Sequence, residues 1–196
     1  NFPMYVDDLS TRDDLLKFGE KHNLKVGTIA DLIDYKLSKE STIENVHTKD
    51  VTTEFGEFKL NVWRDVIFDE YHFSLTKGSP EKVDVPMVRV QTQSVLQDTL
   101  GIDEIGKKWS IRKSLQKIAD EGTGVFVLIN HRDAKTYWLS NLKDENIEPK
   151  RNRRVIGIGS QILRAIGLNK IKVLGTPTKY SGLSGFNIEI EGFIDE

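Results

Sequence analysis

Apolar residues recur at helical spacing in the first part of the chain. Between residues 10 and 23, a capping Ser10 precedes a stripe of apolar residues, which predicts a first amphipathic helix. A second helix is predicted over residues 28–39, because Thr28 can cap a stretch in which apolar residues again fall three or four positions apart. Residues 41–50 are mostly polar, and we interpret them as a boundary between this helical tail and a second domain.

The pattern changes to alternation after residue 50, where β-branched and aromatic residues are also enriched. Strands are predicted at residues 51–53, 58–63, 71–76, 86–94, 125–129, 170–174 and 187–193. Helices are predicted over residues 108–120 and from Gly157 onward, where apolar residues return to helical spacing. Because strands and helices alternate from residue 86 onward, we expect an α/β fold that follows an N-terminal helical tail.

A basic run meets the start of the last predicted helix in residues 151–168, which read RNRRVIGIGSQILRAIGL. Free backbone N–H groups at a helix start, next to guanidinium groups, favour the binding of phosphate. The alternative is a solvated basic turn before an ordinary core helix, and composition alone favours this alternative.

The composition is ordinary for a soluble globular protein, with 196 residues of which 38% are hydrophobic and 30% are charged. The formal charge of −2 predicts no general attraction to nucleic acid or to anionic membranes. No apolar run approaches the roughly 20 residues that cross a bilayer. The start of the sequence also lacks the features of a signal peptide, so we expect a cytoplasmic protein. The absence of cysteine excludes disulfides and thiolate metal sites within this sequence.

Several stretches resemble GTP cyclohydrolase II, an enzyme that opens the imidazole ring of GTP at the start of riboflavin synthesis. They are TTEFGEFKL, IADEGTGVFVL, VIGIGSQILRAIGL and GLSGFNIEI. The resemblance covers the chain from about residue 51 to its end. It implies a mixed sheet with flanking helices of the GTP cyclohydrolase II type, a domain over residues 46–196, and a homodimer.

The amino-terminal residues resemble a second family. LLKFGEKHNLKVGTIADLIDYKLSKE is similar to the carboxyl-terminal end of 3,4-dihydroxy-2-butanone 4-phosphate synthase, most of all in KHNLKVGTIADLI. The resemblance implies that residues 1–45 are the tail of such a domain in a longer fused protein, whose lyase domain uses magnesium. The residues that bind phosphate and metal in that family lie upstream of this stretch, so residues 1–45 are not expected to carry the lyase chemistry.

The zinc site implied by the first resemblance is not matched in this sequence. In that family an Arg-Val pair opens a motif that ends in the first of three cysteines, spaced Cys-x10-Cys-x-Cys. Arg89 and Val90 match the pair, but Ser94, Ile105 and Lys107 stand at the cysteine positions. These side chains do not replace thiolate ligands, so no zinc and no zinc-activated water is expected. The histidines also lack ligand spacing; they are His22, His47, His72 and His131.

The positions that survive from the family's site are cationic. Arg154 matches an arginine implicated in attack on the α-phosphate, and Lys179 matches a lysine that meets the nucleotide phosphates. With Arg89, we expect them to meet at one end of the sheet and to bind phosphate, pyrophosphate or a nucleotide. Asn152 replaces the family's aspartate, the family's glycine-rich loop is not matched after the strand at residues 125–129, and the context of Tyr137 does not match the family's tyrosine.

Three hypotheses about function stay open at this point. The first is a catalytically silent GTP cyclohydrolase II-like domain that acts as a structural or regulatory partner of the fused lyase. The second is a module that binds phosphate or a nucleotide through Arg89, Arg154 and Lys179 without turnover, although solvated surface charge explains the same residues. The third is an enzyme that hydrolyses GTP without a metal, and the loss of all three ligand positions weighs against it.

Overall fold

The chain divides into two units, residues 1–36 and residues 37–196. The computed structural model describes residues 12–27, 41–102, 109–130, 153–177 and 187–195. In the first unit, helix α1 (Arg12–Lys21) confirms the first predicted helix. The second predicted helix, over residues 28–39, lies outside the described residues. No helix in the described part of the chain is long and apolar enough to cross a membrane.

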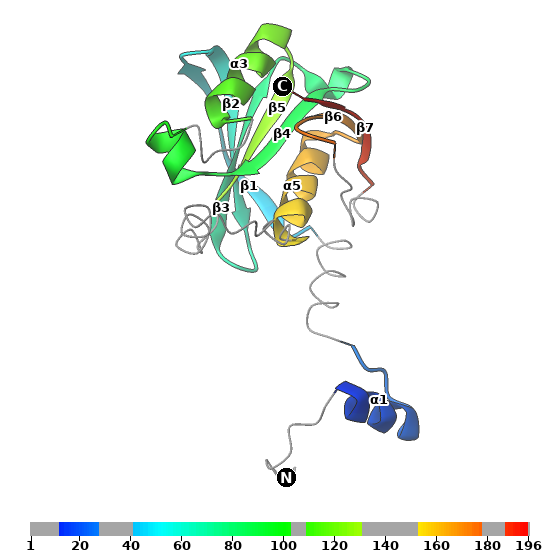
Figure 1. Ribbon diagram of the computed structural model, residues 1–196. Helices are drawn as coiled ribbons and strands as arrows, with labels where there is room; N and C mark the ends of the chain where they lie inside the picture. The colour runs from blue at the N-terminus through cyan, green and yellow to red at the C-terminus, as the bar shows by residue number, and fades with distance from the viewer. Residues whose placement is uncertain (1–11, 28–40, 103–108, 131–152, 178–186, 196) are drawn as a thin grey trace. The chain divides into compact units, whose positions relative to one another are not determined.

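The second unit is built on a seven-stranded mixed sheet with the strand order β1-β2-β3-β5-β4-β6-β7 (Figure 1). The strands are β1 (Ile43–Thr53), β2 (Gly56–Asp65), β3 (Glu70–Lys77), β4 (Met87–Thr92), β5 (Gly124–Ile129), β6 (Lys170–Leu174) and β7 (Glu189–Ile194). β1, β2, β3 and β5 pair antiparallel, whereas β5, β4, β6 and β7 pair parallel. The predicted α/β fold with a mixed sheet is confirmed.

Among the described residues, one long helix covers each face of the parallel half of the sheet. Helix α3 (Ile111–Glu121) connects β4 to β5, and helix α5 (Arg153–Ile166) connects β5 to β6. The two connections run in opposite directions, because β5 and β6 lie on opposite sides of β4. Right-handed crossovers then place the two helices on opposite faces. The short helices η1 (Pro80–Lys82) and η2 (Val95–Thr99) precede and follow β4.

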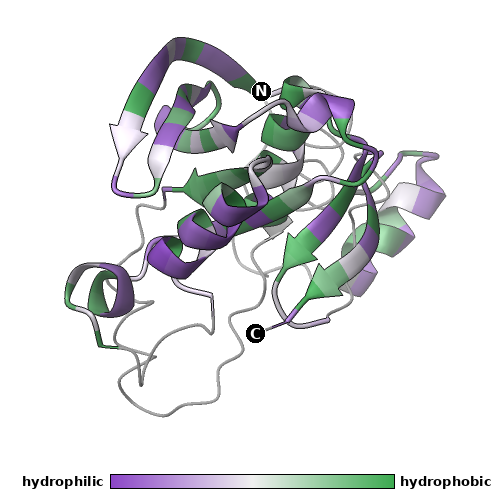
Figure 2. Cartoon of the chain, turned by 90° about the horizontal axis from the view of Figure 1, so that it is seen from above, coloured by the Kyte–Doolittle hydropathy of each residue, from purple (hydrophilic) through white to green (hydrophobic). Residues whose placement is uncertain are grey.

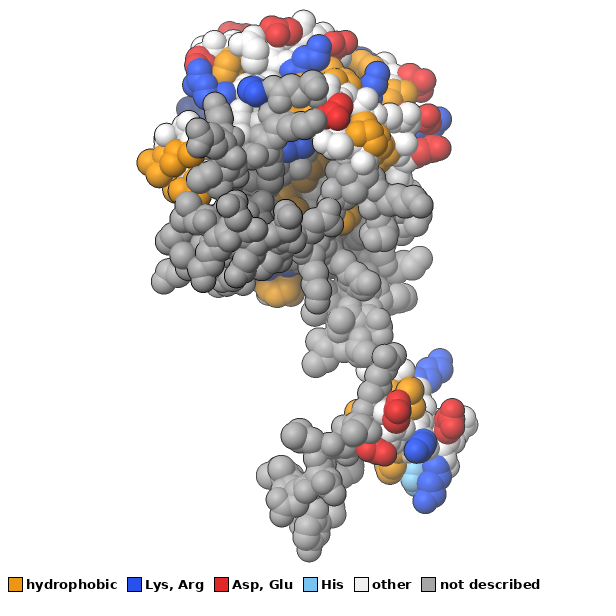
Figure 3. Space-filling model, in the orientation of Figure 1, with side chains coloured by type: hydrophobic (Ala, Val, Ile, Leu, Met, Phe, Trp, Pro, Cys, Tyr) orange, Lys and Arg blue, Asp and Glu red, His pale blue; other side chains and the backbone are white. Residues whose placement is uncertain are grey.

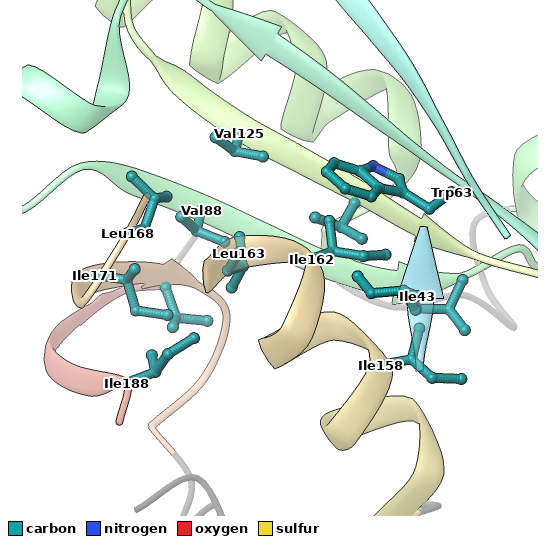
Figure 4. Close-up of a cluster of buried hydrophobic side chains, with 13 residues drawn as sticks. Ile43, Trp63, Val88, Val125, Ile158, Ile162, Leu163, Leu168, Ile171 and Ile188 are labelled. Carbon is teal, nitrogen blue, oxygen red and sulfur yellow. The ribbon is translucent and has the colours of Figure 1, made fainter. Parts of the chain in front are cut away.

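Two hydrophobic clusters fill the space between the helices and the sheet. The cluster under α5 includes Val88, Val125, Ile158 and Ile162 (Figure 4). The cluster under α3 includes Met87, Phe126, Leu115 and Ile118. Successive residues of β4 and of β5 therefore point to opposite faces, as strand geometry requires. Helix α3 turns a hydrophilic side outward (Figure 2).

The polar segment that was interpreted as a domain boundary forms most of an edge strand. β1 begins at Ile43 and pairs with β2, with an irregularity between Asn45 and His47. Residues 44–50 are all exposed. Backbone hydrogen bonds hold an edge strand on one side, so its sequence need not alternate, and charges and bulges on such an edge prevent unwanted pairing with other chains. The segment that was interpreted as a domain boundary therefore belongs, from Ile43 onward, to the sheet of the second unit.

Helix α5 begins at Arg153, earlier than the predicted start at Gly157. Gly157 and Gly159 therefore lie inside the helix, and their N–H groups are not the free donors of a helix start. The structure gives Gly159 a different role, because a Cβ atom there would lie 2.8 Å from Cγ1 of Val90. The absence of a side chain lets α5 approach β4 closely.

Replacing Gly159 by alanine tests this close approach. We expect the free energy of unfolding to fall by about 1 to 3 kcal/mol, the range for overpacking, even though alanine favours a helix by about 1 kcal/mol over glycine. Urea unfolding followed by circular dichroism measures the change. Arg164→Ala, at an exposed position of the same helix, is the control and should shift stability little. An unchanged or raised stability of Gly159→Ala would show that α5 can move away from Val90 without cost.

Candidate functional site

The carboxyl ends of β4 and β5 mark the place where a ligand site is expected in this sheet. These strands are neighbours, and Thr92 pairs with Ile129 at their ends. The helices that follow them lie on opposite faces, and in open α/β sheets ligands bind outside the carboxyl ends of strands at such a point. We call this end of the sheet the carboxyl edge. It includes η2, the start of α5 and, because β3 runs antiparallel to β5, the turn between β2 and β3.

Arg154, which was predicted to bind phosphate, lies in the first turn of α5 and contacts the β2–β3 hairpin. Its Nη2 donates to Oε2 of Glu70 at 2.6 Å and to Oδ2 of Asp65 at 3.3 Å. Its guanidinium carbon lies 3.6 Å from the centre of the Phe68 ring, a cation–π contact. The Arg154 side chain is 18% exposed, and the carboxylates of Asp65 and Glu70 are buried. We call Arg154, Asp65 and Glu70 the Arg154 cluster.

In the Arg154 cluster, one guanidinium pairs with two carboxylates. Oδ1 of Asp65 also accepts the backbone N–H groups of Ile67 at 3.0 Å and Phe68 at 3.4 Å, so this carboxylate organises the turn as well. A phosphate at Arg154 would compete with both carboxylates for the guanidinium and would be repelled by them. These contacts favour a structural role for Arg154 over anion binding.

Arg89 lies on the opposite face of the sheet from Arg154. Its neighbours in β4, Val88 and Val90, pack into the cluster under α5, so the Arg89 side chain points towards α3. The expectation that Arg89 and Arg154 share one pocket was therefore wrong, because strand alternation separates them. Lys179, the third predicted cation, lies outside the described residues.

The Arg89 side chain donates hydrogen bonds to three residues: Leu174, Trp109 and Gln91. Its Nη1 donates to the carbonyl oxygen of Leu174 at 2.6 Å, and its Nη2 donates to that of Trp109 at 3.2 Å. Its Nε donates to Oε1 of Gln91 at 2.8 Å. Arg89 thus connects β4 to the end of β6 and to the segment that enters α3. Gln91 is a buried partner of this arginine.

Ser94, at the first cysteine position of the family motif, caps η2. Its Oγ accepts the backbone N–H of Gln97 at 3.4 Å, and its own N–H donates to Oδ2 of Asp98 at 2.7 Å. Oδ1 of Asp98 accepts the N–H of Ile111 at 3.1 Å, which connects η2 to the start of α3. The Ser94 hydroxyl therefore accepts one backbone N–H group of η2.

The residues present do not fit the zinc of the resembled family. Ile105 and Lys107 lie outside the described residues, but neither side chain is a thiolate. Within the described ranges, no three His, Cys, Asp or Glu residues are placed together to hold a metal ion. Asn152 and Tyr137 also lie outside the described residues, so the expectation that neither replaces the family's aspartate or tyrosine stays untested.

Sequence reasoning missed the buried polar residues of the β2–β3 hairpin. His72 is fully buried in β3, and its Nδ1 accepts the backbone N–H of Asn130 at 3.2 Å, which places the proton of a neutral ring on Nε2. A signal for these residues existed. Asp65 lies two residues after the buried Trp63, and Glu70 lies two residues before His72, so alternation places all four on the inward face.

Two cavities among the described residues lie at the opposite end of the sheet. One of about 500 Å³ is lined by residues that include Glu81, Asp84 and Lys170, and one of about 360 Å³ by residues that include Lys117 and Lys172. Both lie near the amino ends of the parallel strands, away from the Arg154 cluster. At the first cavity, a hydrogen bond to Glu191 raises the pKa of Lys170. Neither cavity is lined by Arg89 or Arg154.

Comparisons with known proteins agree with this fold. Residues 44–195 match the family model of GTP cyclohydrolase II. The chain is 34% identical to 3,4-dihydroxy-2-butanone 4-phosphate synthase of Pseudomonas syringae pv. tomato, over 93% of this chain and 52% of that protein. It is 33% identical to riboflavin biosynthesis protein RibBA of Aquifex aeolicus, over 90% of this chain and 48% of that protein.

One solved structure has a fold similar to that of this chain. It is the crystal structure of RibBX from A. baumannii, described as a two domain 3,4-dihydroxy-2-butanone 4-phosphate synthase. The match has a TM-score of 0.65 and 32% identity, and it covers 94% of this chain and 50% of that one. The chain spans about half the length of the curated relatives it matches, 52% in the Pseudomonas protein and 48% in the Aquifex protein.

Replacing Arg154 by methionine tests the structural role of the Arg154 cluster. It leaves two buried carboxylates without their guanidinium, so we expect a loss of about 3 to 5 kcal/mol in the free energy of unfolding. The matched control is Arg112→Met, because Arg112 pairs with Glu54 on the surface and an exposed pair contributes at most about 1 kcal/mol. Adding Asp65→Asn and Glu70→Gln to Arg154→Met should restore part of the stability. Equal losses for Arg154→Met and Arg112→Met in urea unfolding would contradict the buried cluster.

Replacing Arg89 by methionine separates its structural role from anion binding. The variant loses charge-assisted hydrogen bonds to two carbonyl groups, so we expect a destabilisation of about 1.5 to 3 kcal/mol. Any pyrophosphate binding measured by calorimetry should stay unchanged, because the guanidinium is engaged on the α3 face. Weakened pyrophosphate binding with unchanged stability would restore Arg89 as a ligand of the anion.

Proposed function

This chain belongs to the GTP cyclohydrolase II family, and from that premise we propose that it is a catalytically silent member with a structural or regulatory role. The domain at residues 46–196 would serve a 3,4-dihydroxy-2-butanone 4-phosphate synthase domain in the same longer polypeptide. Residues 1–45 would be the tail of that synthase domain. The proposal includes a homodimer in the cytoplasm, no zinc, and magnesium only in the synthase domain.

The engagement of Arg154 is the observation that carries the proposal. The resemblance assigns this arginine to chemistry at the α-phosphate, but here it bonds to two buried carboxylates and stacks on Phe68. An arginine in this setting would give up strong ion pairs before it could bind a phosphate. The role of Ser94 as a cap of η2 supports the same conclusion for the first metal position.

The relatives support the fused arrangement. Proteins about twice the matched length carry the name 3,4-dihydroxy-2-butanone 4-phosphate synthase alone, as in Pseudomonas syringae and Neisseria meningitidis. That name refers to the lyase reaction and not to GTP. In these relatives, the half that is similar to this chain contributes no activity to the protein's name. This agrees with a partner domain that is catalytically silent.

Binding of an anion without turnover is the second candidate, and the described contacts favour it less. It would use Arg89, Arg154 and Lys179, but the first two lie on opposite faces and donate to protein oxygens. Calorimetry with pyrophosphate and GTP tests it directly. A dissociation constant in the micromolar range that rises at least tenfold in a Lys179→Ala variant would favour the binding module. Turnover of GTP without a metal, the third candidate, has no supporting observation among the described residues.

Formate release and synthase activity together test the proposed function. We expect the purified chain to release no formate from GTP and to contain no stoichiometric zinc, because the three ligand positions are Ser94, Ile105 and Lys107. Restoring three cysteines at these positions should not recover turnover. In the longer polypeptide, removal of residues 46–196 should lower the synthase activity or its stability to heat. Formate release from GTP would contradict catalytic silence, and an unaltered synthase after the deletion would contradict a structural or regulatory role.

A further inference from the structure

Exposed large apolar side chains gather at the carboxyl edge of the sheet. In the described part of residues 37–196 they include Val66, Ile67, Phe68, Tyr71, Val95 and Leu100. Val95 is the first residue of η2 and Leu100 follows its last residue, and hydrophobic side chains are seen there on the left of Figure 3. At the opposite end of the sheet, the exposed large apolar residue among those described is Val83. Singly scattered apolar residues need no explanation, whereas contiguous exposed ones mark interaction sites, and Val66, Ile67 and Phe68 are consecutive in one turn.

The turn between β2 and β3 presents three of these side chains in succession. Val66 is 44% exposed, Ile67 is 50% exposed and Phe68 is 36% exposed. We call Val66, Ile67 and Phe68 the hairpin tip. A run of three exposed apolar residues in a short turn is unusual, because turns are normally formed by Gly, Pro, Asn, Asp and Ser.

Several contacts hold the hairpin tip in one conformation. Oδ1 of Asp65 accepts the N–H groups of Ile67 and Phe68. Arg64 and Asp69 form an ion pair across the base of the turn at 2.9 Å. Arg154 covers the Phe68 ring from α5. The tip is therefore preorganised, and a rigid apolar group loses less conformational freedom on binding than a flexible loop does.

The chain enters the sheet directly beside the hairpin tip. The carbonyl oxygen of Thr42 accepts the N–H of Val66 at 2.9 Å. The N–H of Thr42 donates to Oε1 of Gln161 in α5 at 2.7 Å, and its Oγ1 donates to the same oxygen at 3.2 Å. Thr42 is buried, so the point at which the preceding polypeptide joins the sheet is fixed next to the tip.

We propose that the hairpin tip is the docking site for the synthase domain that precedes this chain in the longer polypeptide. This inference rests on the proposed function. The relatives have about as much polypeptide again as this chain, and any domain attached through Thr42 is held at a high effective concentration near the tip. The contact would be an apolar one, in which the tip fills a hydrophobic pocket of the synthase domain and the rigid turn supplies its precise shape.

The absence of cysteine makes the tip accessible to a direct experiment. Ile67→Cys is compared with Val83→Cys, whose parent residue is 39% exposed at the other end of the sheet. The rate of maleimide labelling at each position is followed by peptide mass spectrometry, which separates it from any cysteine of the synthase half. In the 196-residue chain we expect similar rates at the two positions. In the longer polypeptide we expect labelling at position 67 to be at least tenfold slower than at position 83.

The outcomes distinguish this inference from the proposed function. Equal labelling rates in the longer polypeptide overturn the docking site, whatever the synthase activity is after deletion of residues 46–196. Slow labelling that becomes fast on dilution would assign the tip to a second copy of the chain and also overturn it. Slow labelling at every concentration supports docking even where formate release refutes catalytic silence. As a second arm, Ile67→Glu should restore fast labelling of a Phe68→Cys reporter in the longer polypeptide, whereas Val83→Glu should not.

Discussion

The ion pairs between Arg154 and the carboxylates of Asp65 and Glu70 are the interaction on which the arrangement of the domain depends. Helix α5 packs on the parallel half of the sheet, whereas Asp65 and Glu70 belong to the antiparallel half. Arg154 in the first turn of α5 therefore connects this helix to the antiparallel half at the carboxyl edge, as do the hydrogen bonds between Gln161 and Thr42 and the packing of Ile43 and Trp63 into the cluster under α5. The ion pairs are largely buried, so each charge has lost hydration and is destabilising unless its partner is present. The same contacts also fix the turn that follows Asp65.

The use of polar residues differs between the two faces of the sheet, and this difference bears on function. On the α3 face, Arg89 donates to the side-chain oxygen of Gln91 and to two carbonyl groups. On the α5 face, Arg154 binds the hairpin. A site that binds a nucleoside triphosphate needs several cations that converge on one set of phosphates. Here Arg89 and Arg154 lie on opposite faces of the sheet and donate to protein oxygens, so the described contacts do not bring these two cations together on one set of phosphates.

Sequence periodicity predicted most of the elements, and its failures have physical causes. The buried strands and the helix α3 were predicted because each presents one apolar face, and α3 also has clear start and stop signals in Ser110 and Gly122. A strand was predicted at residues 51–53, the end of β1, but the part of β1 before residue 51 was missed because its partners are backbone groups of β2 and not apolar neighbours. The early start of α5 was missed because Gly159, which serves close packing against Val90, was interpreted as a sign of a helix start. The candidate site could not be predicted from spacing, since the separation of Arg89 from Arg154 depends on which face each element presents.

A domain without chemistry can still influence an attached enzyme if its attachment is rigid. Thr42 is bound both to the hairpin tip and to α5, so a displacement of the preceding polypeptide would act on both elements at once. The hairpin tip is in turn joined to α5 by Arg154. These contacts form a closed set in which Thr42, the tip and α5 hold one another, and none of them can move alone without breaking hydrogen bonds in a buried region. In the proposed arrangement, the synthase domain would contact the hairpin tip, whose position depends on the ion pairs and the ring contact of Arg154.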